Sequence, residues 1–202
     1  MDGWVSGRSE KNVIAQSIMN HLLTLRSLKI SRLSFSFDLA DFDPFKNSRW
    51  PYLTHVGINV CQQNILLRLL QQAPNLSSAK ISIDLVYTGQ PSGPPLPVEP
   101  FTHTKLQVLH INCPRSLPPL PNLLNALSLP NLREFMASSA WMWWPHEEFK
   151  AFLARSKCPL EFLSFGDGNR AALDELRAEY IALIPSLEVV DQARGCFIFC
   201  KA

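Results

Sequence analysis

The sequence predicts an α/β solenoid, in which layers of strand and helix stack into a single domain over residues 1–202. The first observation is a short apolar pattern, L-x-x-L-x-φ, in which φ is any apolar residue; its clearest copy is Leu160, Leu163 and Phe165. The second is that a proline, Pro159 in this copy, ends the preceding helical segment before an alternating strand begins. Helix end, proline and strand recur along the chain, which indicates a repeat protein.

The apolar pattern occurs seven times at near-regular spacing. Its copies are Ile30/Leu33/Phe35, Leu53/Val56/Ile58, Leu76/Ala79/Ile81, Leu106/Leu109/Ile111, Leu132/Phe135/Ala137, Leu160/Leu163/Phe165 and, less clearly, Leu187/Val190. The copies start at positions 30, 53, 76, 106, 132, 160 and 187, so the intervals are 23, 23, 30, 26, 28 and 27 residues. Most of these intervals lie in or near the range of leucine-rich repeats, which predicts an irregular leucine-rich-repeat solenoid.

Prolines mark the start of most predicted strands independently of the leucines. Pro51, Pro74, Pro130 and Pro185 each stand two residues before the first leucine of a copy. Because proline lacks an N–H and has a fixed φ, it ends the incoming segment at each of these places. The copy that begins at Leu106 has no such proline.

Apolar residues at helical spacing predict helices between the strands. The predicted helices cover residues 13–23, 62–73, 146–156 and 169–184. The connections 88–100 and 114–129 are instead rich in proline, and the second has room only for a short helix at 122–127. We therefore expect helices and Pro-rich loops on the convex side and a curved parallel sheet on the concave side.

Strand alternation sorts the residues of each predicted strand between the core and the concave surface. The residues of the apolar pattern face the core, so the residues between them face outward. The candidate partner-binding residues on this surface are His55, Asn59, Lys80, His110, Asn112, Glu134, Met136 and Phe162. Their chemistry is mixed and contains no obvious reaction centre, which favours a surface for another protein over a catalytic site.

Composition argues against several classes of function. The net charge is +2 without any basic run, which disfavours a nucleic-acid partner. No apolar stretch approaches the roughly 20 residues of a membrane-spanning helix, and no nucleotide-binding or hydrolase motif occurs. The five cysteines include no C-x-x-C pair, so we expect a reduced, cytoplasmic or nuclear protein. We expect a binding protein that is not an enzyme and needs no cofactor or metal.

One long phrase resembles a known family. F-L-A-R-S-K-C-P-L-E-F-L-S-F at Phe152–Phe165, followed by I-P-S-L-E-V-V-D at Ile184–Asp191, is similar to the leucine-rich-repeat portion of fungal F-box proteins. The resemblance implies that the repeats hold a protein to be ubiquitinated by a cullin-RING ligase. No F-box motif precedes Ile30, where the chain opens with M-D-G-W-V-S-G-R-S-E. The resemblance therefore implies the substrate-recognition half only, and docking to the ligase adaptor stays an open question.

Two other functions fit the same sequence. One is a ligase-independent scaffold that binds partners through the convex Pro-rich loops. The other is a truncated product without a stable partner, which the missing F-box and the lack of clear polar caps suggest.

Further residues allow both a functional and a structural interpretation. Trp141, Trp143 and Trp144 stand at a predicted rim loop, where they form either an aromatic anchor for a partner or packing beneath the following helix. R-S-L-P-P-L-P at Arg115–Pro121 has the form of an SH3 ligand, although a constrained crossover is the better interpretation. No group of residues has the spacing of a metal site.

Overall fold

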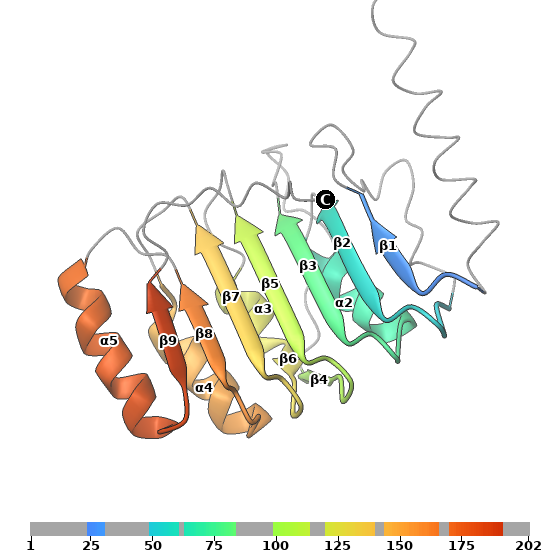
Figure 1. Cartoon of the computed structure of the whole chain (residues 1–202). Coiled ribbons are helices and arrows are strands. Elements are labelled where there is room, and N and C mark those ends of the chain that lie inside the picture. The colour runs from blue at the N-terminus through green and yellow to red at the C-terminus, as the bar shows by residue number, and fades with distance from the viewer. Residues whose placement is uncertain are drawn as a thin grey trace, which may run out of the picture.

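The computed structural model describes residues 24–30, 49–60, 63–83, 99–113, 120–139, 144–165 and 170–191. These residues form an α/β fold around a seven-stranded sheet in which all neighbouring strands are parallel. Its strands follow the order of the chain: β1 (Ser27–Lys29), β2 (His55–Val60), β3 (Ser78–Ile83), β5 (Val108–Cys113), β7 (Glu134–Ser139), β8 (Phe162–Phe165) and β9 (Glu188–Asp191). Figure 1 looks onto this sheet from the side that the helices leave free. The predicted α/β class with a parallel sheet is confirmed.

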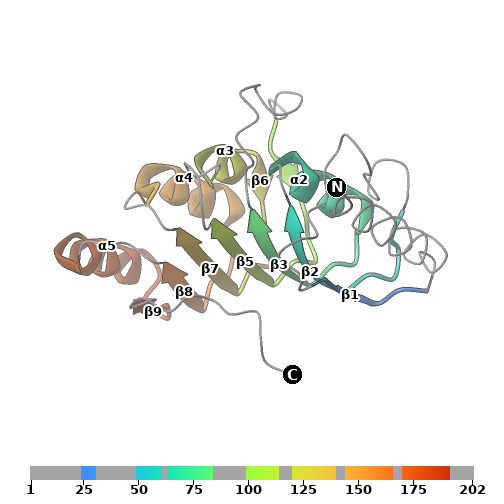
Figure 2. The ribbon, with the colours of Figure 1, turned by 90° about the horizontal axis from the view of Figure 1, so that it is seen from above.

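Helices cover the other face of the sheet. They are α2 (Gln63–Gln72), α3 (Leu120–Asn125), α4 (His146–Ser156) and α5 (Arg170–Leu183). The short strands β4 (Phe101–Thr102) and β6 (Leu127–Ser128) pair with each other as a second parallel sheet. Figure 2 shows α2, α3, α4 and β6 together along one side of the large sheet. We call the opposite side, where the structure describes neither helix nor further strand, the open face.

The helices form where apolar spacing predicts them. α2 buries Ile65, Leu66, Leu69 and Leu70, the stripe that identifies it in the sequence. α4 has its predicted bounds. The residue after it, Lys157, is its C-cap and adopts the left-handed conformation at φ 49°. α3 and α5 lie within two residues of their predicted bounds, and the predicted helix 13–23 lies outside the described residues.

Strand register turns the apolar pattern into a continuous core. The second residue of one copy pairs with the second residue of the next. This ladder consists of Leu28, Val56, Ala79, Leu109, Phe135, Leu163 and Val189. All seven are buried. A single layer would leave its apolar row in water, so neighbouring layers stabilise each other by burying it.

The first strand lies earlier in the chain than the sequence pattern predicts. Leu28 pairs with Val56, so the copy that borders β2 is Leu25, Leu28 and Ile30; Leu33 and Phe35 of the predicted copy lie outside the described residues. Leu25 and Ile30 pack against the core that contains Leu28. The same spacing of apolar residues occurs in both alternatives, and the hydrogen bonds to β2 select the earlier one.

The last predicted copy is shifted by one residue. Val189 pairs with Leu163 in the core, whereas Val190 faces outward and is 36% exposed. The strand begins at Glu188, directly after Leu187, while the preceding strands begin two residues after the corresponding leucine. The shorter connection reverses which of the two valines is buried, because successive strand residues face opposite sides.

The prolines occupy one position of a repeated tight turn. In the turns that end at Leu53, Leu76, Leu132 and Leu187, the leucine N–H donates to the carbonyl three residues earlier, at 3.3, 3.1, 3.2 and 2.9 Å. Each proline stands at the second position of its turn, where its fixed φ is already suitable. The proline therefore starts each of these strands through turn geometry.

A buried histidine replaces this arrangement before Leu106. Nδ1 of His103 accepts the N–H groups of Leu106 at 3.1 Å and of Lys105 at 3.3 Å. Nε2–H of His103 donates to the carbonyl of Ala73 at 3.1 Å, which begins the equivalent turn of the preceding layer. Burial lowers the pKa of His103, whose side chain is neutral in this role. One imidazole ring thus joins two neighbouring turns.

Two residues of the family-like phrase, Arg155 and Ser156, fasten neighbouring layers. Arg155 donates from Nε and Nη2 to the carbonyl of Leu127 at 3.1 and 2.9 Å, and from Nη2 to the carbonyl of Leu124 at 2.5 Å. Oγ of the buried Ser156 accepts the N–H of Leu129 at 3.0 Å. All three partners belong to the connection from β5 to β7. This part of the phrase therefore serves the packing of α4 against the preceding layer.

Candidate partner-binding face

The open face carries outward-facing side chains from all seven strands. Alternation directs every second residue of a strand to this side. Strand register assigns to it Ser27, Lys29, His55, Asn59, Ser78, Lys80, Ser82, Val108, His110, Asn112, Glu134, Met136, Ser138, Phe162, Ser164, Glu188 and Val190. The eight residues that the sequence predicts for the sheet surface are all among them.

The structure brings His110 and Glu134 into direct contact near the middle of the open face. Nε2–H of His110 donates to Oε1 of Glu134 across neighbouring strands at 2.6 Å. Burial lowers the pKa of His110 and nearby Lys80 acts in the same direction, while Glu134 opposes both. The imidazole is therefore neutral at pH 7, and the pair forms a fixed polar centre of the face.

A row of small polar side chains lies toward the carboxyl ends of the central strands. Register aligns Asn59, Ser82, Asn112 and Ser138 on four successive strands. Oγ of Ser138 donates to Oδ1 of Asn112 at 2.8 Å. This bond orients the Asn112 amide so that its NH₂ group faces away from Ser138, available to a partner.

The β7–β9 end of the face contains its largest apolar side chains, Met136, Phe162 and Val190, beside the carboxylates of Glu134 and Glu188. Met136, Ser164 and Val190 are register partners on three successive strands, and Phe162 lies beside them. Ser164 is 1% exposed, and its hydroxyl has no hydrogen-bond partner among the described residues. A buried hydroxyl without a hydrogen-bond partner lowers the stability of the folded chain, so the serine at this position is destabilising.

Four residues of the face escape sequence analysis because the terminal copies are shifted. Ser27 and Lys29 belong to a strand that the pattern places after Ile30. Glu188 and Val190 face outward where the pattern predicts their neighbours. The available signal was the alternative copy at Leu25, Leu28 and Ile30, which fits the same spacing.

Trp144 is partly buried and packs against the core, which favours the second of its two interpretations. Its ring stacks on Phe165 with centroids 4.6 Å apart and meets Phe149 edge-on at 5.1 Å. Its Nε1–H donates to the hydroxyl of Tyr180 at 2.7 Å. Packing beneath the following helix is therefore the correct interpretation for Trp144. The other two tryptophans, at positions 141 and 143, lie outside the described residues.

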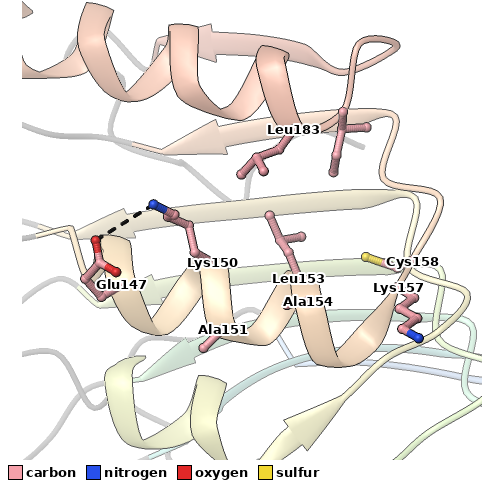
Figure 3. A pocket seen from close by; sticks show the side chains of 9 residues that line it. Glu147, Lys150, Ala151, Leu153, Ala154, Lys157, Cys158 and Leu183 are labelled. Carbon is pink, nitrogen blue, oxygen red and sulfur yellow. Dashed lines mark ion pairs between the residues drawn. The ribbon is translucent and has the colours of Figure 1, made fainter.

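A groove lies between α4 and α5 on the helix side, with a volume of about 660 Å³ (Figure 3). Leu153, Ala154 and Leu183 form apolar parts of its lining, while Lys150 and Glu147 form an ion pair at one end, 4.0 Å apart. Sequence analysis did not identify this groove. The groove depends on the contact between α4 and α5, which leaves Leu183 56% exposed, and the sequence pattern contains no signal for that contact.

The polar groups near the groove serve packing. Nδ1 of His146 accepts the hydroxyl of Tyr180 at 2.8 Å, and Nε2 of His146 donates to Glu179 at 3.0 Å. Burial raises the pKa of Tyr180, so its hydroxyl stays protonated. Burial also raises the pKa of Cys158, in the groove lining, to about 11, which disfavours a reactive thiolate at neutral pH.

Metal and membrane signals were sought over the described part of the chain. No cluster of three or more His, Cys, Asp or Glu side chains there could hold a metal ion. None of the described helices combines the length and apolar character that crossing a bilayer requires. No protein-family model, curated protein or solved structure matches the chain.

Proposed function

We propose that the chain is an irregular leucine-rich-repeat solenoid whose open face binds a protein partner. The observation that carries this proposal is the contrast between the two faces of the sheet. Helices bury one face, while the other presents charged, amide, imidazole and apolar side chains from seven strands in register. Such a rigid, chemically mixed surface suits recognition of another polypeptide.

The size of the face indicates the strength of the interaction. Seven strands about 4.8 Å apart span roughly 29 Å, and six residues of strand extend about 20 Å. Because β1, β8 and β9 are shorter than six residues, the face offers at most roughly 600 Å², less than the about 800 Å² per partner of a standard stable interface. We therefore expect the face to bind either a transient partner or an extended segment of one. Weak binding of this kind suits a recognition module that must release its target.

We further propose that this partner is a protein destined for ubiquitination. The support is the resemblance of the phrase at Phe152–Phe165 to the repeats of fungal F-box proteins. The contacts of Arg155 and Ser156 give part of that phrase a role in stacking the layers. The ligase assignment therefore depends on the resemblance, while the binding assignment depends on the open face.

Affinity purification with quantitative mass spectrometry tests the binding proposal. One variant replaces His110, Asn112, Glu134 and Met136 with alanine. A matched control replaces four exposed or half-exposed residues of α4 and α5 with alanine: Glu148, Glu175, Arg177 and Glu179. Proteins captured by the wild type and the control should be absent with the open-face variant, provided that all three chains melt at similar temperatures. Equal capture by all three, or loss only with the control, would refute the proposal.

A second measurement tests the ligase assignment separately. The half-lives of the captured proteins are compared in cells with and without this chain after protein synthesis is stopped. Lengthened half-lives in the absence of the chain support ubiquitination. Unchanged half-lives would leave a binding module without a ligase role.

A further inference from the structure

We infer that the open face binds a polypeptide segment in which acidic residues precede or follow apolar residues, with the carboxylates over β1–β3 and the apolar side chains over β7–β9. This inference rests on the proposed function, because it specifies the partner of the same face. It is argued from the unequal chemistry of the two ends of the sheet.

A basic notch lies at the β1–β3 end. Lys29, Gly57 and Lys80 are register partners on three successive strands, so the two exposed lysines flank a residue without a side chain. Their backbone positions are two strand spacings, or about 9.6 Å, apart. A Cβ atom placed on Gly57 would come 3.5 Å from Cγ of Lys29. Gly57 thus has no side chain of its own between the two lysines, and the stem of Lys29 lies within van der Waals range of that position, so a carboxylate side chain can approach both ammonium groups.

The charge of this notch is not neutralised by any ion pair among the described residues. β1, β2 and β3 contain no Asp or Glu. Lys29 and Lys80 form no ion pair within the described part of the chain. Of the two described carboxylates of the face, Glu134 and Glu188, Glu134 lies closer in strand order; it is on β7, two strands beyond β3, and is held by His110. An incoming acidic group therefore meets two available lysines.

The β7–β9 end has the opposite character. Met136, Phe162 and Val190 offer apolar surface around the buried Ser164. Two carboxylates border this surface: Glu188 is exposed at its edge, and Glu134, the register partner of Phe162, is paired with His110. An acidic segment would be repelled there, while apolar side chains would gain by burial. The two ends together select one orientation of a bound segment.

The distance between the ends sets the spacing of the bound residues. Gly57 lies on β2 and Met136 on β7, three strand spacings or about 14 Å apart. An extended chain rises about 3.3 Å per residue, so an acidic and an apolar residue about four positions apart would reach both sites. Nucleic acid fits this face poorly, because its regular phosphates would meet the apolar end and Glu188.

Selection from a phage-displayed library of random twelve-residue peptides tests the inference with the full chain. Wild-type protein should recover peptides with Asp or Glu about four positions from a large apolar residue. The variant K29E/K80E should lose this acidic preference. A recovered peptide should bind K29E/K80E at least about tenfold more weakly than it binds the wild type. Its affinity for the wild type should fall when the salt concentration is raised. K105E, which changes charge at an exposed turn residue outside the face, should bind like the wild type.

The outcomes separate this inference from the proposed function. Peptides that depend on the open face but are neutral or basic, or that bind K29E/K80E unchanged, would overturn the inference alone. A single-stranded RNA twelve-mer that binds through Lys29 and Lys80 more tightly than any peptide would also overturn it. If every recovered peptide also bound the four-alanine open-face variant, or if no peptide were recovered, both the inference and the proposed function would be contradicted.

Discussion

Nε2–H of His103 donates to the carbonyl of Ala73 across thirty residues of sequence, at 3.1 Å. The same ring accepts the N–H of Leu106 on its Nδ1 atom, so it closes its own turn and ties it to the preceding one. In the turns with proline, a backbone carbonyl accepts the leucine N–H and so closes the turn. His103 therefore supports the layer in which the proline is missing.

Replacement of His103 with alanine should destabilise the fold by about 2 kcal/mol or more, because a buried ring and its hydrogen bonds are lost together. His103→Asn should cost less, since a short amide oxygen still accepts a nearby turn N–H. Urea unfolding followed by circular dichroism measures both. Equal stability of wild type and His103→Ala would contradict the assigned role.

Stability should also depend on pH through His103. Burial lowers its pKa in the folded chain below the ordinary value of 6.5, so the unfolded chain binds this proton first as the pH falls. The contribution of neutral His103 is therefore complete above about pH 6.5 and decreases below it. The difference in unfolding free energy between wild type and His103→Asn should shrink from pH 8 to pH 5. Other titrating groups, including His110, cancel in this difference; a constant difference would refute the assignment.

Two buried serines should respond in opposite ways to alanine. Ser156 accepts the N–H of Leu129, so Ser156→Ala leaves a buried donor without a partner and should cost about 1–3 kcal/mol. Ser164 has no hydrogen-bond partner among the described residues, so Ser164→Ala should leave stability unchanged or raise it by about 1 kcal/mol. Both side chains are almost fully buried, which makes them matched controls for each other. Chemical denaturation measures the unfolding free energy of both variants. Equal losses of unfolding free energy would contradict the contacts assigned to these two serines.

Arg155 should be sensitive even to a conservative change. Arg155→Lys keeps the charge but lacks the planar fork that reaches the carbonyls of Leu124 and Leu127. We expect both Arg155→Lys and Arg155→Ala to lower the melting temperature, with a loss of about 1–3 kcal/mol for alanine. Arg177→Ala, at an exposed position of α5, should have little effect. Differential scanning calorimetry makes the comparison, and a similar effect of Arg177→Ala would weaken the proposed stacking contact.

The middle of the sheet could be predicted because its signal is local and repeated. Leu53, Leu76, Leu132 and Leu160 each begin an apolar pattern that is buried as expected, and prolines occupy the second position of the turns that end at the first three. The ends of the sheet were predicted wrongly. Near Ile30 two overlapping copies satisfy the same spacing, and only pairing with β2 distinguishes them.

The candidate site divides in the same way. The outward positions of the central strands follow from alternation, which needs no knowledge of the neighbours. The bond between His110 and Glu134, the notch beside Gly57 and the inward packing of Trp144 join residues from different layers. Such contacts depend on register and side-chain orientation, which a linear pattern does not contain.

By itself, the sequence determined the α/β class, the central strands, most of the helices and the outward alternation of the open face. It could do so because apolar periodicity and proline act within a few residues of chain. Tertiary structure decided the register at both ends, the partners of His103 and Arg155, and the separation of a basic end from an apolar end. Those features arise only when segments about thirty residues apart come within hydrogen-bonding distance.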